Sequence, residues 1–253
     1  KVISRHGVGY DNVDTAYLKK KEITLLITAT ANAVAVSEHV FYLMLTISKN
    51  FLNLDREVRS GNFKNDIKNF PTFELYNKEI LIAGFGRIGK NLIKKCKGFD
   101  MKVKVYDPFV DEKLISSMGG LKVENFNEAL TTADFLSIHM PLNEKTKNLI
   151  NLQKMKEMKK SSVIINTARG GIVNEIDLDQ ALNDKFILAA GLDVFSSEPI
   201  NLDNPLLKNK KVVLSPHTAA LTNECKIRMG METAQNLINF FEKKIDKNMI
   251  VKL

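Results

Sequence analysis

The sequence predicts an α/β fold built on a doubly wound parallel sheet, and three observations lead to this prediction. Short apolar runs alternate with helical stretches over most of the 253 residues, which is typical of a parallel sheet covered by helices. A turn with the spacing G-x-G-x-x-G separates an apolar run from a basic helical stretch. An acidic residue then ends the following apolar run, where a dinucleotide-binding unit places one.

The glycine-rich turn lies in the stretch LIAGFGRIGKNL, residues 81–92, and the apolar run before it reads as a buried strand. Gly84 permits a tight turn, Gly86 removes the side chain that would keep a pyrophosphate off the backbone, and Gly89 lets helix and strand pack closely. The start of the helix offers unpaired N–H groups and a positive dipole end to phosphates. We therefore expect a Rossmann-type dinucleotide site, with a plain α/β turn as the alternative.

The second strand supports the same interpretation. Residues 101–108, MKVKVYDP, end in Asp107, whose carboxylate can accept hydrogen bonds from both ribose hydroxyls. The same carboxylate would repel a 2′-phosphate, and the following stretch PFVDEK contains no arginine to bind one. NAD is therefore the expected cofactor, rather than NADP.

Later apolar runs are expected to continue the sheet, at residues 133–141, 161–168, 187–195 and 211–218. Helices are expected between them, at residues 127–133, 151–158 and 175–185. In an open sheet of this kind, ligands bind beyond the carboxyl ends of the strands. Polar residues that follow the strands are therefore the candidates for a functional site.

Two long helical patterns, at residues 33–49 and 222–243, flank this alternation. Residues 1–32 hold two strand patterns, a glycine loop and a short helix, which is too little to bury a core alone. We expect residues 1–32 to be the remnant of a substrate domain whose N-terminal part is missing from this sequence. Residues 33–221 are then the NAD-binding domain with its linker helix, and residues 222–253 a helix that returns to the substrate domain.

The composition excludes several classes of function. The net charge is +8, but only six of the 37 basic residues are arginine, and the lysines are spread along the chain with no tryptophan among them. This favours a solvated, lysine-rich surface over a nucleic-acid site. No apolar run reaches the length of a membrane span, and no spacing of ligands predicts a metal site. Two cysteines outside any disulfide pattern favour the reducing cytoplasm.

Three polar residues follow predicted strands: Arg169 in NTARGGIV, Glu198 in LDVFSSEP and His217 in SPHTAA. Alone, each has a structural explanation, as a turn cap, a solvated acid or a structural histidine. Together, they suit hydride transfer between a nicotinamide, which carries the hydride, and a 2-hydroxy acid. His217 would take the hydroxyl proton, Glu198 would stabilise the imidazolium, and Arg169 would hold the carboxylate.

The chain resembles the D-isomer-specific 2-hydroxyacid dehydrogenases, nearest to the D-3-phosphoglycerate dehydrogenase branch, in the motifs RHGVGYDNVD, ANAVAVSEH, GFGRIG, VYDP, HMPLNEKTKNLI, NTARGGIV, GLDVFSSEP and SPHTAAL. The resemblance implies that Arg169, Glu198 and His217 are the catalytic set. It also implies a D-2-hydroxy acid and its 2-keto acid as substrates, a flavodoxin-like second domain, and a homodimer joined partly by residues 40–75.

The resemblance further implies individual binding residues. On the cofactor side, Arg87 and Ile88 would meet the pyrophosphate, and the remaining contacts would come from His139, Thr167, Ala168, Asp193 and Ala219. A structural role for His139 is the alternative. On the substrate side, Val8 and Gly9 would offer backbone N–H groups to the carboxylate, and Arg5 and Asn32 would complete the contacts.

Several alternatives stay open at this point. Arg5 and the positive charge favour a phosphorylated substrate, whereas HTAALTNE and Lys64 favour a glyoxylate or hydroxypyruvate reductase. A formate or phosphite dehydrogenase relative would use the same fold, although formate dehydrogenases carry glutamine at the position of Glu198. An NAD-sensing transcriptional corepressor, a binding module rather than an enzyme, is the alternative from another class.

Overall fold

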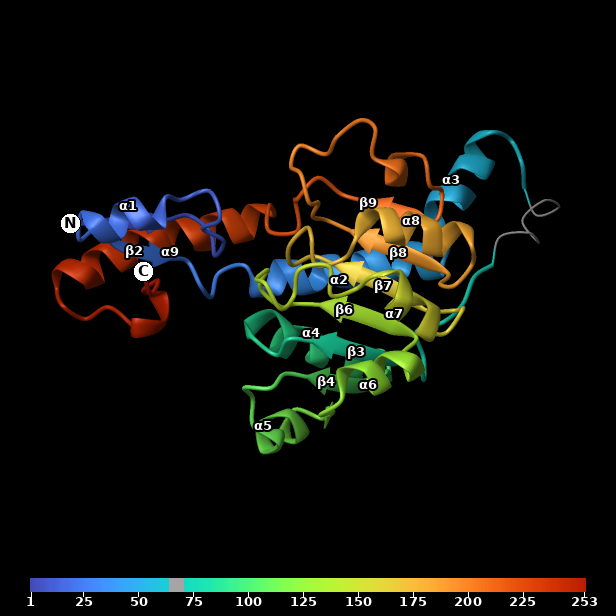
Figure 1. Cartoon of the computed structure of the whole chain (residues 1–253), viewed down its shortest axis with the longest axis horizontal. Helices are drawn as coiled ribbons and strands as arrows, with labels where there is room; N and C mark the ends of the chain where they lie inside the picture. The colour runs from blue at the N-terminus through green and yellow to red at the C-terminus, as the bar shows by residue number, and fades with distance from the viewer. Residues whose placement is uncertain (64–70) are drawn as a thin grey trace. The chain divides into compact units, whose positions relative to one another are not determined.

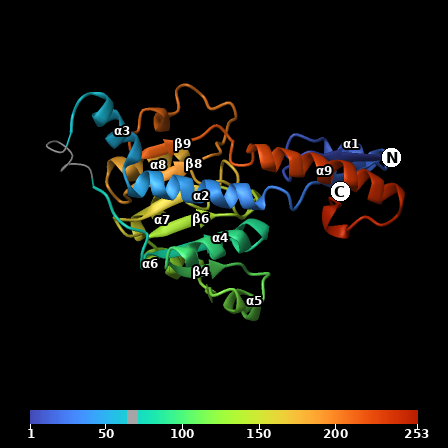
Figure 2. The same cartoon turned by 180° about the vertical axis from the view of Figure 1, so that it is seen from behind.

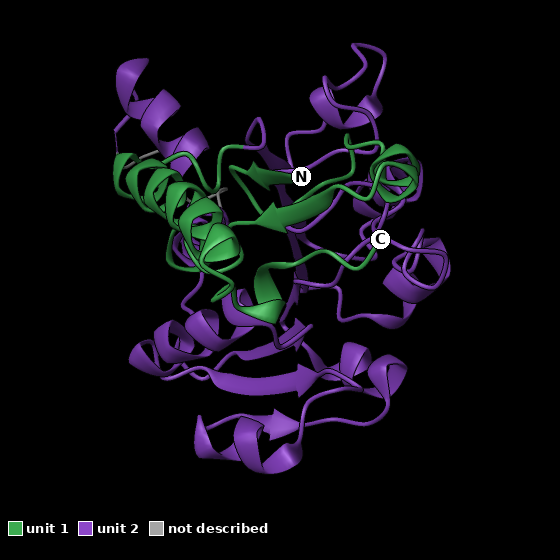
Figure 3. Cartoon of the chain, turned by 90° about the vertical axis from the view of Figure 1, so that its left-hand side faces the viewer, with its two compact units in different colours: residues 1–36, 218–253 green, residues 37–217 purple. Residues whose placement is uncertain are grey.

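The computed structural model describes residues 1–63 and 71–253. The chain forms two compact units, coloured separately in Figure 3. Unit 1 comprises residues 1–36 and 218–253, and unit 2 comprises residues 37–217. Each unit is described by itself below.

Unit 2 is built, within the described residues, on a seven-stranded parallel sheet with the strand order β5-β4-β3-β6-β7-β8-β9. The predicted doubly wound parallel sheet is therefore confirmed. The order runs outward from β3 in both directions, so the topological switch point lies between β3 and β6. The strands are β3 (Glu79–Ala83), β4 (Lys102–Tyr106), β5 (Leu121–Lys122), β6 (Phe135–Ile138), β7 (Val163–Asn166), β8 (Ala189–Leu192) and β9 (Val212–Leu214).

Helices cover both faces of this sheet, as the two opposite views in Figures 1 and 2 show. One face packs against α2 (Ala33–Ser48), whose first turn belongs to unit 1, and against α4 (Arg87–Gly98) and α5 (Glu112–Ser117). The other packs against α6 (Phe126–Thr132), α7 (Leu152–Glu157) and α8 (Glu175–Asn183). The strands β6, β7 and β8 are buried along their whole length, as expected for parallel strands covered on both sides.

Three elements of unit 2 were not predicted from the sequence. The strand β5 has only two residues and extends the sheet at its edge, and the six-residue helix α5 precedes it. The helix α3 (Phe51–Arg59) has no buried residue. The elements β5 and α5 are too short to leave a clear periodic pattern, whereas the apolar residues Phe51, Leu54 and Val58 of α3 do recur at helical spacing. Lys64 and part of the 40–75 segment lie outside the described residues.

Unit 1 contains a two-stranded parallel sheet of β1 (Val2–Arg5) and β2 (Thr24–Ile27), joined through the short helix α1 (Thr15–Lys20). The long helix α9 (Asn223–Phe241) is tied to both strands: Ser4 Oγ donates to Thr233 O, and the buried Asn236 donates to Ile27 O. Glu232 of α9 accepts hydrogen bonds from the backbone N–H groups of Thr30 and Ala31. Leu18, Leu25 and Val251 form a small apolar core within this unit.

The close packing of α4 against β3 generates a prediction. A Cβ atom at Gly89 would lie 2.6 Å from the Gly84 carbonyl oxygen, whereas one at Gly98, in the same helix, would meet nothing within 4 Å. Gly89→Ala should therefore lower the free energy of unfolding by about 1–3 kcal/mol through steric overlap. The matched variant Gly98→Ala should be neutral or slightly stabilising. Urea denaturation of both variants tests this, and equal stabilities would contradict the packing argument.

Candidate active site

A cleft of about 1090 Å³ opens at the carboxyl ends of β4, β3 and β6, at the switch point of the sheet. The residues that directly follow these strands, Asp107, Gly84 and His139, all line it. The sequence placed Gly84 and Asp107 in one dinucleotide site. In the structure, the two do lie in one cleft.

The glycine-rich turn is packed too tightly for any other residue at two of its three glycines. Gly84 has a φ of +100°, and a Cβ on it would lie 2.7 Å from the His139 carbonyl oxygen. A Cβ on Gly89 would overlap the Gly84 carbonyl, as described above. Gly86 differs, because a Cβ there would meet nothing within 4 Å. Its surface is therefore bare backbone that a ligand can approach closely.

Gly86 is also the N-cap of α4, and no side chain caps that end of the helix. Arg87 and Ile88 follow as the first helical residues. The N–H groups and the positive dipole end of a twelve-residue helix therefore face outward, beside a glycine without a side chain. This arrangement fits a pyrophosphate.

Asp107 is held in place by the backbone around it. One carboxylate oxygen accepts from Phe85 N at 2.7 Å and the other from Phe109 N at 2.9 Å. The first contact ties the end of β4 to the glycine-rich turn. The carboxylate is thus fixed at the mouth of the cleft, where the ribose of a dinucleotide would bind.

His139 is neutral throughout the physiological range, because burial lowers the pKa of its imidazole to about 3. Its Nε2 atom lies 2.8 Å from Ser137 Oγ, and its buried Nδ1 atom has no partner among the described residues. The buried hydroxyl of Thr167, which follows β7, also lacks a partner among them. Two orphaned polar atoms beyond neighbouring strands fit a bound ligand that would satisfy them.

A second group of polar residues lies beyond the carboxyl ends of β7, β8 and β9. His217 Nδ1 lies 2.6 Å from Glu198 Oε2, and Glu198 Oε1 accepts from Phe195 N at 3.0 Å. His217 has a φ of 53°, in the left-handed region that few side chains adopt. The pairing of His217 with Glu198 that the sequence analysis inferred is thus present as a direct hydrogen bond.

Arg169 lies on the adjacent loop. A Cβ at the next residue, Gly170, would overlap the Phe195 carbonyl and its peptide bond, so the loop after β7 lies directly against the loop that carries Glu198. The buried Asn166 holds the first of these loops, since it accepts from Ala168 N and donates to Arg169 O. Arg169 Nη1 donates to Ala168 O at 2.7 Å.

Sequence reasoning missed three residues that shape this region. Glu175 is 8% exposed and accepts from Ser196 N and Asn204 Nδ2, which fixes the loop on both sides of Glu198. His39 and Ser215 form a hydrogen-bonded chain to Asp193. A buried acid or histidine within an apolar helical pattern was the only available signal.

The remaining predicted residues belong to unit 1. Arg5 Nη1 donates to Asn12 Oδ1 at 2.7 Å, while its buried Nε atom has no partner among the described residues. Val8 and Gly9 lie in the loop after β1, which Thr28 anchors by accepting from Gly7 N. Asn32 directly precedes α2, and Ala219 is buried. The structure does not relate these residues to the site in unit 2.

Residues 1–63 and 71–253 lack two features. In that part of the chain, no helix is long and apolar enough to cross a membrane. No group of three or more histidine, cysteine, aspartate or glutamate residues in it could hold a metal ion.

These features define the class of protein: a Rossmann-type dinucleotide-binding protein with a histidine–glutamate pair beyond its sheet. The model of the family described as "D-isomer specific 2-hydroxyacid dehydrogenase, NAD binding domain" matches residues 41–219. The chain belongs to this family, as the resemblance indicated. The matching domain also confirms NAD as the cofactor.

Individual relatives agree with this assignment. The chain is 36% identical over 250 residues to a D-3-phosphoglycerate dehydrogenase of Methanocaldococcus jannaschii, a match that covers 99% of this chain and 47% of that protein. It is 33% identical over 254 residues to a glyoxylate reductase of Korarchaeum cryptofilum, a match that covers 99% of this chain and 76% of that protein. The structure of an NAD-dependent formate dehydrogenase of Staphylococcus aureus in complex with NAD matches with a TM-score of 0.87 and 30% sequence identity. The match covers 100% of this chain and 76% of that chain.

The chain spans about half the length of the curated phosphoglycerate dehydrogenases that it matches.

The position of Asp107 generates a prediction about cofactor choice. Asp107→Asn keeps a hydrogen-bond acceptor but removes the charge that repels a 2′-phosphate. The Kd for NADPH divided by the Kd for NADH should therefore fall about tenfold. Fluorescence titration measures both Kd values. Asp111→Asn, which retains the N-cap of α5 outside the cleft, should leave the ratio unchanged. An unaltered ratio in Asp107→Asn would exclude Asp107 from cofactor selection.

Proposed function

We propose that this protein is an NAD-dependent dehydrogenase that interconverts a D-2-hydroxy acid and its 2-keto acid. The observation that carries the proposal is the 2.6 Å contact between His217 Nδ1 and Glu198 Oε2 in a member of this family. When bound, NAD supplies the hydride acceptor. The protein's own residues then have to accept one proton and bind one carboxylate.

His217 is the proposed base. With Nδ1 directed at Glu198, the Nε2 atom on the other side of the ring takes the proton of the substrate hydroxyl as the C–H bond breaks. The imidazolium that results is stabilised by the Glu198 carboxylate. In the reverse direction, the same Nε2 atom returns the proton to the oxygen of the keto acid.

Arg169 is the proposed ligand of the substrate carboxylate and carbonyl, because its planar guanidinium can donate two parallel hydrogen bonds. Val8 and Gly9 are proposed backbone donors to the same carboxylate, with Asn32 beside them. On the cofactor side, we assign Gly86, Arg87 and Ile88 to the pyrophosphate, with Gly84 and Gly89 shaping the turn that holds them. His139, Thr167, Ala168, Asp193 and Ala219 are assigned to the remaining cofactor contacts.

The substrate is proposed to be either 3-phosphoglycerate or glyoxylate and hydroxypyruvate. Arg5 favours the phosphorylated substrate, since its buried Nε atom is without a partner in the described chain. The domain boundaries are proposed at residues 32 and 221, with residues 1–32 and 222–253 contributing to a flavodoxin-like substrate domain. A cytoplasmic location is supported by two buried cysteines, Cys96 and Cys225, both free thiols.

The main test is oxidation of NADH at 340 nm with phosphohydroxypyruvate, hydroxypyruvate and glyoxylate. It is run on the 253-residue chain. His217→Gln should reduce kcat at least about 100-fold, because a general base contributes that much, while NADH affinity stays unchanged. Leu202→Gln, at a loop residue that is 84% exposed, is the control.

Each outcome of this assay has a meaning. Loss of NADH binding in His217→Gln would point to a structural role for the histidine and contradict the proposed base. Reduction of NAD by formate, measured at the same wavelength, with no turnover of the three keto acids would favour the formate dehydrogenase alternative, in which no hydroxyl proton has to be removed. NADH binding with no turnover of any of these acids would favour the corepressor alternative.

We also infer that the protein forms a homodimer through the face that carries α3. Three apolar side chains of this helix, Phe51, Leu52 and Val58, are 58%, 46% and 56% exposed. The strand β9 forms one edge of the sheet, and α3 lies beside this edge (Figure 1). A pocket of about 490 Å³ lies between α2, α3 and the starts of β8 and β9.

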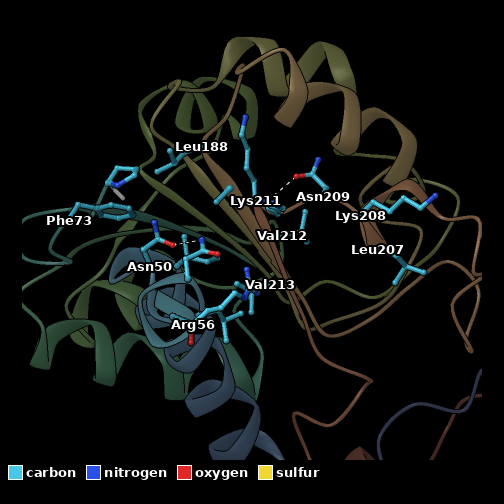
Figure 4. A pocket seen from close by; sticks show the side chains of 17 residues that line it. Asn50, Arg56, Phe73, Leu188, Leu207, Lys208, Asn209, Lys211, Val212 and Val213 are labelled. Atoms are coloured by element: carbon cyan, nitrogen blue, oxygen red, sulfur yellow. Dashed lines mark hydrogen bonds between the residues drawn. The ribbon is translucent and has the colours of Figure 1, made fainter. Parts of the chain in front are cut away.

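Figure 4 shows the side chains around this pocket, where apolar residues alternate with cations and amides. The labelled lining residues are Asn50, Arg56, Phe73, Leu188, Leu207, Lys208, Asn209, Lys211, Val212 and Val213. Three exposed apolar side chains on one helix beside a concave surface favour a protein partner. The proposed partner is a second copy of the chain, because a two-fold axis brings the same face of both subunits into contact.

The dimer is tested by Phe51→Asp, since aspartate in the first turn favours the helix but opposes burial at an interface. Sedimentation should show about a tenfold weaker dimer or a monomer. Leu202→Asp, an equally drastic change at an exposed leucine outside this face, should leave the dimer intact. A dimer unaffected by Phe51→Asp would place the interface elsewhere.

A further inference from the structure

Unit 2 contains a chain of hydrogen bonds that ends on a buried carboxylate. Asp193 directly follows β8 and is 1% exposed. Its Oδ1 atom accepts from Ser215 Oγ at 2.6 Å, and Ser215 Oγ lies 2.8 Å from His39 Nε2. His39 Nε2 is itself 3.5 Å from Asp193 Oδ1. One residue of α2 and the residues that directly follow β8 and β9 thus form one compact network.

The number of protons fixes the direction of these hydrogen bonds. Ser215 has a single hydroxyl proton, and a carboxylate oxygen only accepts, so this proton is donated to Asp193. The Ser215 oxygen must then accept from His39 Nε2, which therefore carries a proton. His39 is neutral near pH 7, because burial lowers its pKa and the opposing effect of Asp193 is smaller. The network defines one tautomer of His39.

Such an arrangement holds a carboxylate in one orientation. A short hydrogen bond from Ser215 fixes Oδ1, and His39 keeps the serine hydroxyl from rotating toward another acceptor. The ring of His39 is held in turn by Tyr42, one turn further along α2, with 5.2 Å between the ring centroids. Ser215 also lies two residues before His217 and accepts from its backbone N–H. The network therefore connects two proposed functional residues.

We propose that His39 is a positioning residue that acts through Ser215 to orient the Asp193 carboxylate toward the nicotinamide of the bound cofactor. This inference rests on the proposed function, in which Asp193 lies on the nicotinamide side. The neutral imidazole serves as a hydrogen-bond donor, and no proton is transferred. The network accounts for a polar ring in the middle of α2, a helix whose apolar residues pack against the sheet.

The test compares two ligands that differ only in the nicotinamide. NADH and ADP-ribose share the adenosine and the pyrophosphate, but ADP-ribose carries no nicotinamide. His39→Leu removes the donor and should weaken NADH binding about tenfold, while the Kd for ADP-ribose changes less than about twofold. Ser215→Ala breaks the same chain one step later and should have the same effect. Isothermal titration calorimetry measures both ligands on the 253-residue chain.

Conservative variants supply the rescue that a general loss of structure would not show. His39→Gln places an amide N–H near the position of Nε2, and Ser215→Thr keeps the hydroxyl, so both should retain NADH affinity within about threefold. Leu202→Gln, at an exposed loop residue outside the network, is the control and should behave like wild type.

The outcomes separate this inference from the proposed function. If the wild type fails to bind NADH, the proposed function itself is wrong. If the wild type binds NADH but His39→Leu and Ser215→Ala leave the ratio of the two Kd values unchanged, the positioning role is wrong. Equal weakening of both ligands would identify His39 as a structural residue, which would also overturn the proposal.

Discussion

The architecture of unit 2 depends on one constraint, which is that all strands of its sheet run in the same direction. Their carboxyl ends therefore meet at one edge, where residues distant in sequence become neighbours. The strands β4, β3 and β6 end at the dinucleotide cleft, and β7, β8 and β9 end at the histidine–glutamate pair. Binding and chemistry thus share a single edge of one sheet.

Close backbone packing makes this edge rigid. The glycine-rich turn lies against the His139 carbonyl, and Gly170 lies against the Phe195 carbonyl, with no side chain between the segments in either case. Loops that pack through their main chains have little freedom to rearrange. Asp107 and Asn166 add side-chain hydrogen bonds to the backbone of the same loops. The candidate site is therefore largely formed before any ligand binds.

The features that could be predicted from the sequence are those that depend on local patterns or on residues at the ends of strands. The strands of the sheet, the glycine-rich turn and Asp107 follow from periodicity and spacing, and Glu198 and His217 could be paired because both follow strands. The network of His39 and Ser215 could not be predicted, because it joins residues 176 positions apart and no local pattern pairs residues over that distance. The helix α3 was not predicted, although its apolar residues Phe51, Leu54 and Val58 recur at helical spacing.

The carboxylates of unit 2 differ in exposure in a way that matches their proposed roles. Glu175 and Asp193 are 8% and 1% exposed, and each accepts hydrogen bonds that hold a loop or a side chain in place. Glu198 and its partner His217 have side chains that are 37% and 51% exposed. A group that orients others gains from burial, because a low dielectric strengthens its hydrogen bonds. A histidine that releases a proton in each turnover needs a route to water, so the pair proposed for chemistry lies where solvent can reach it.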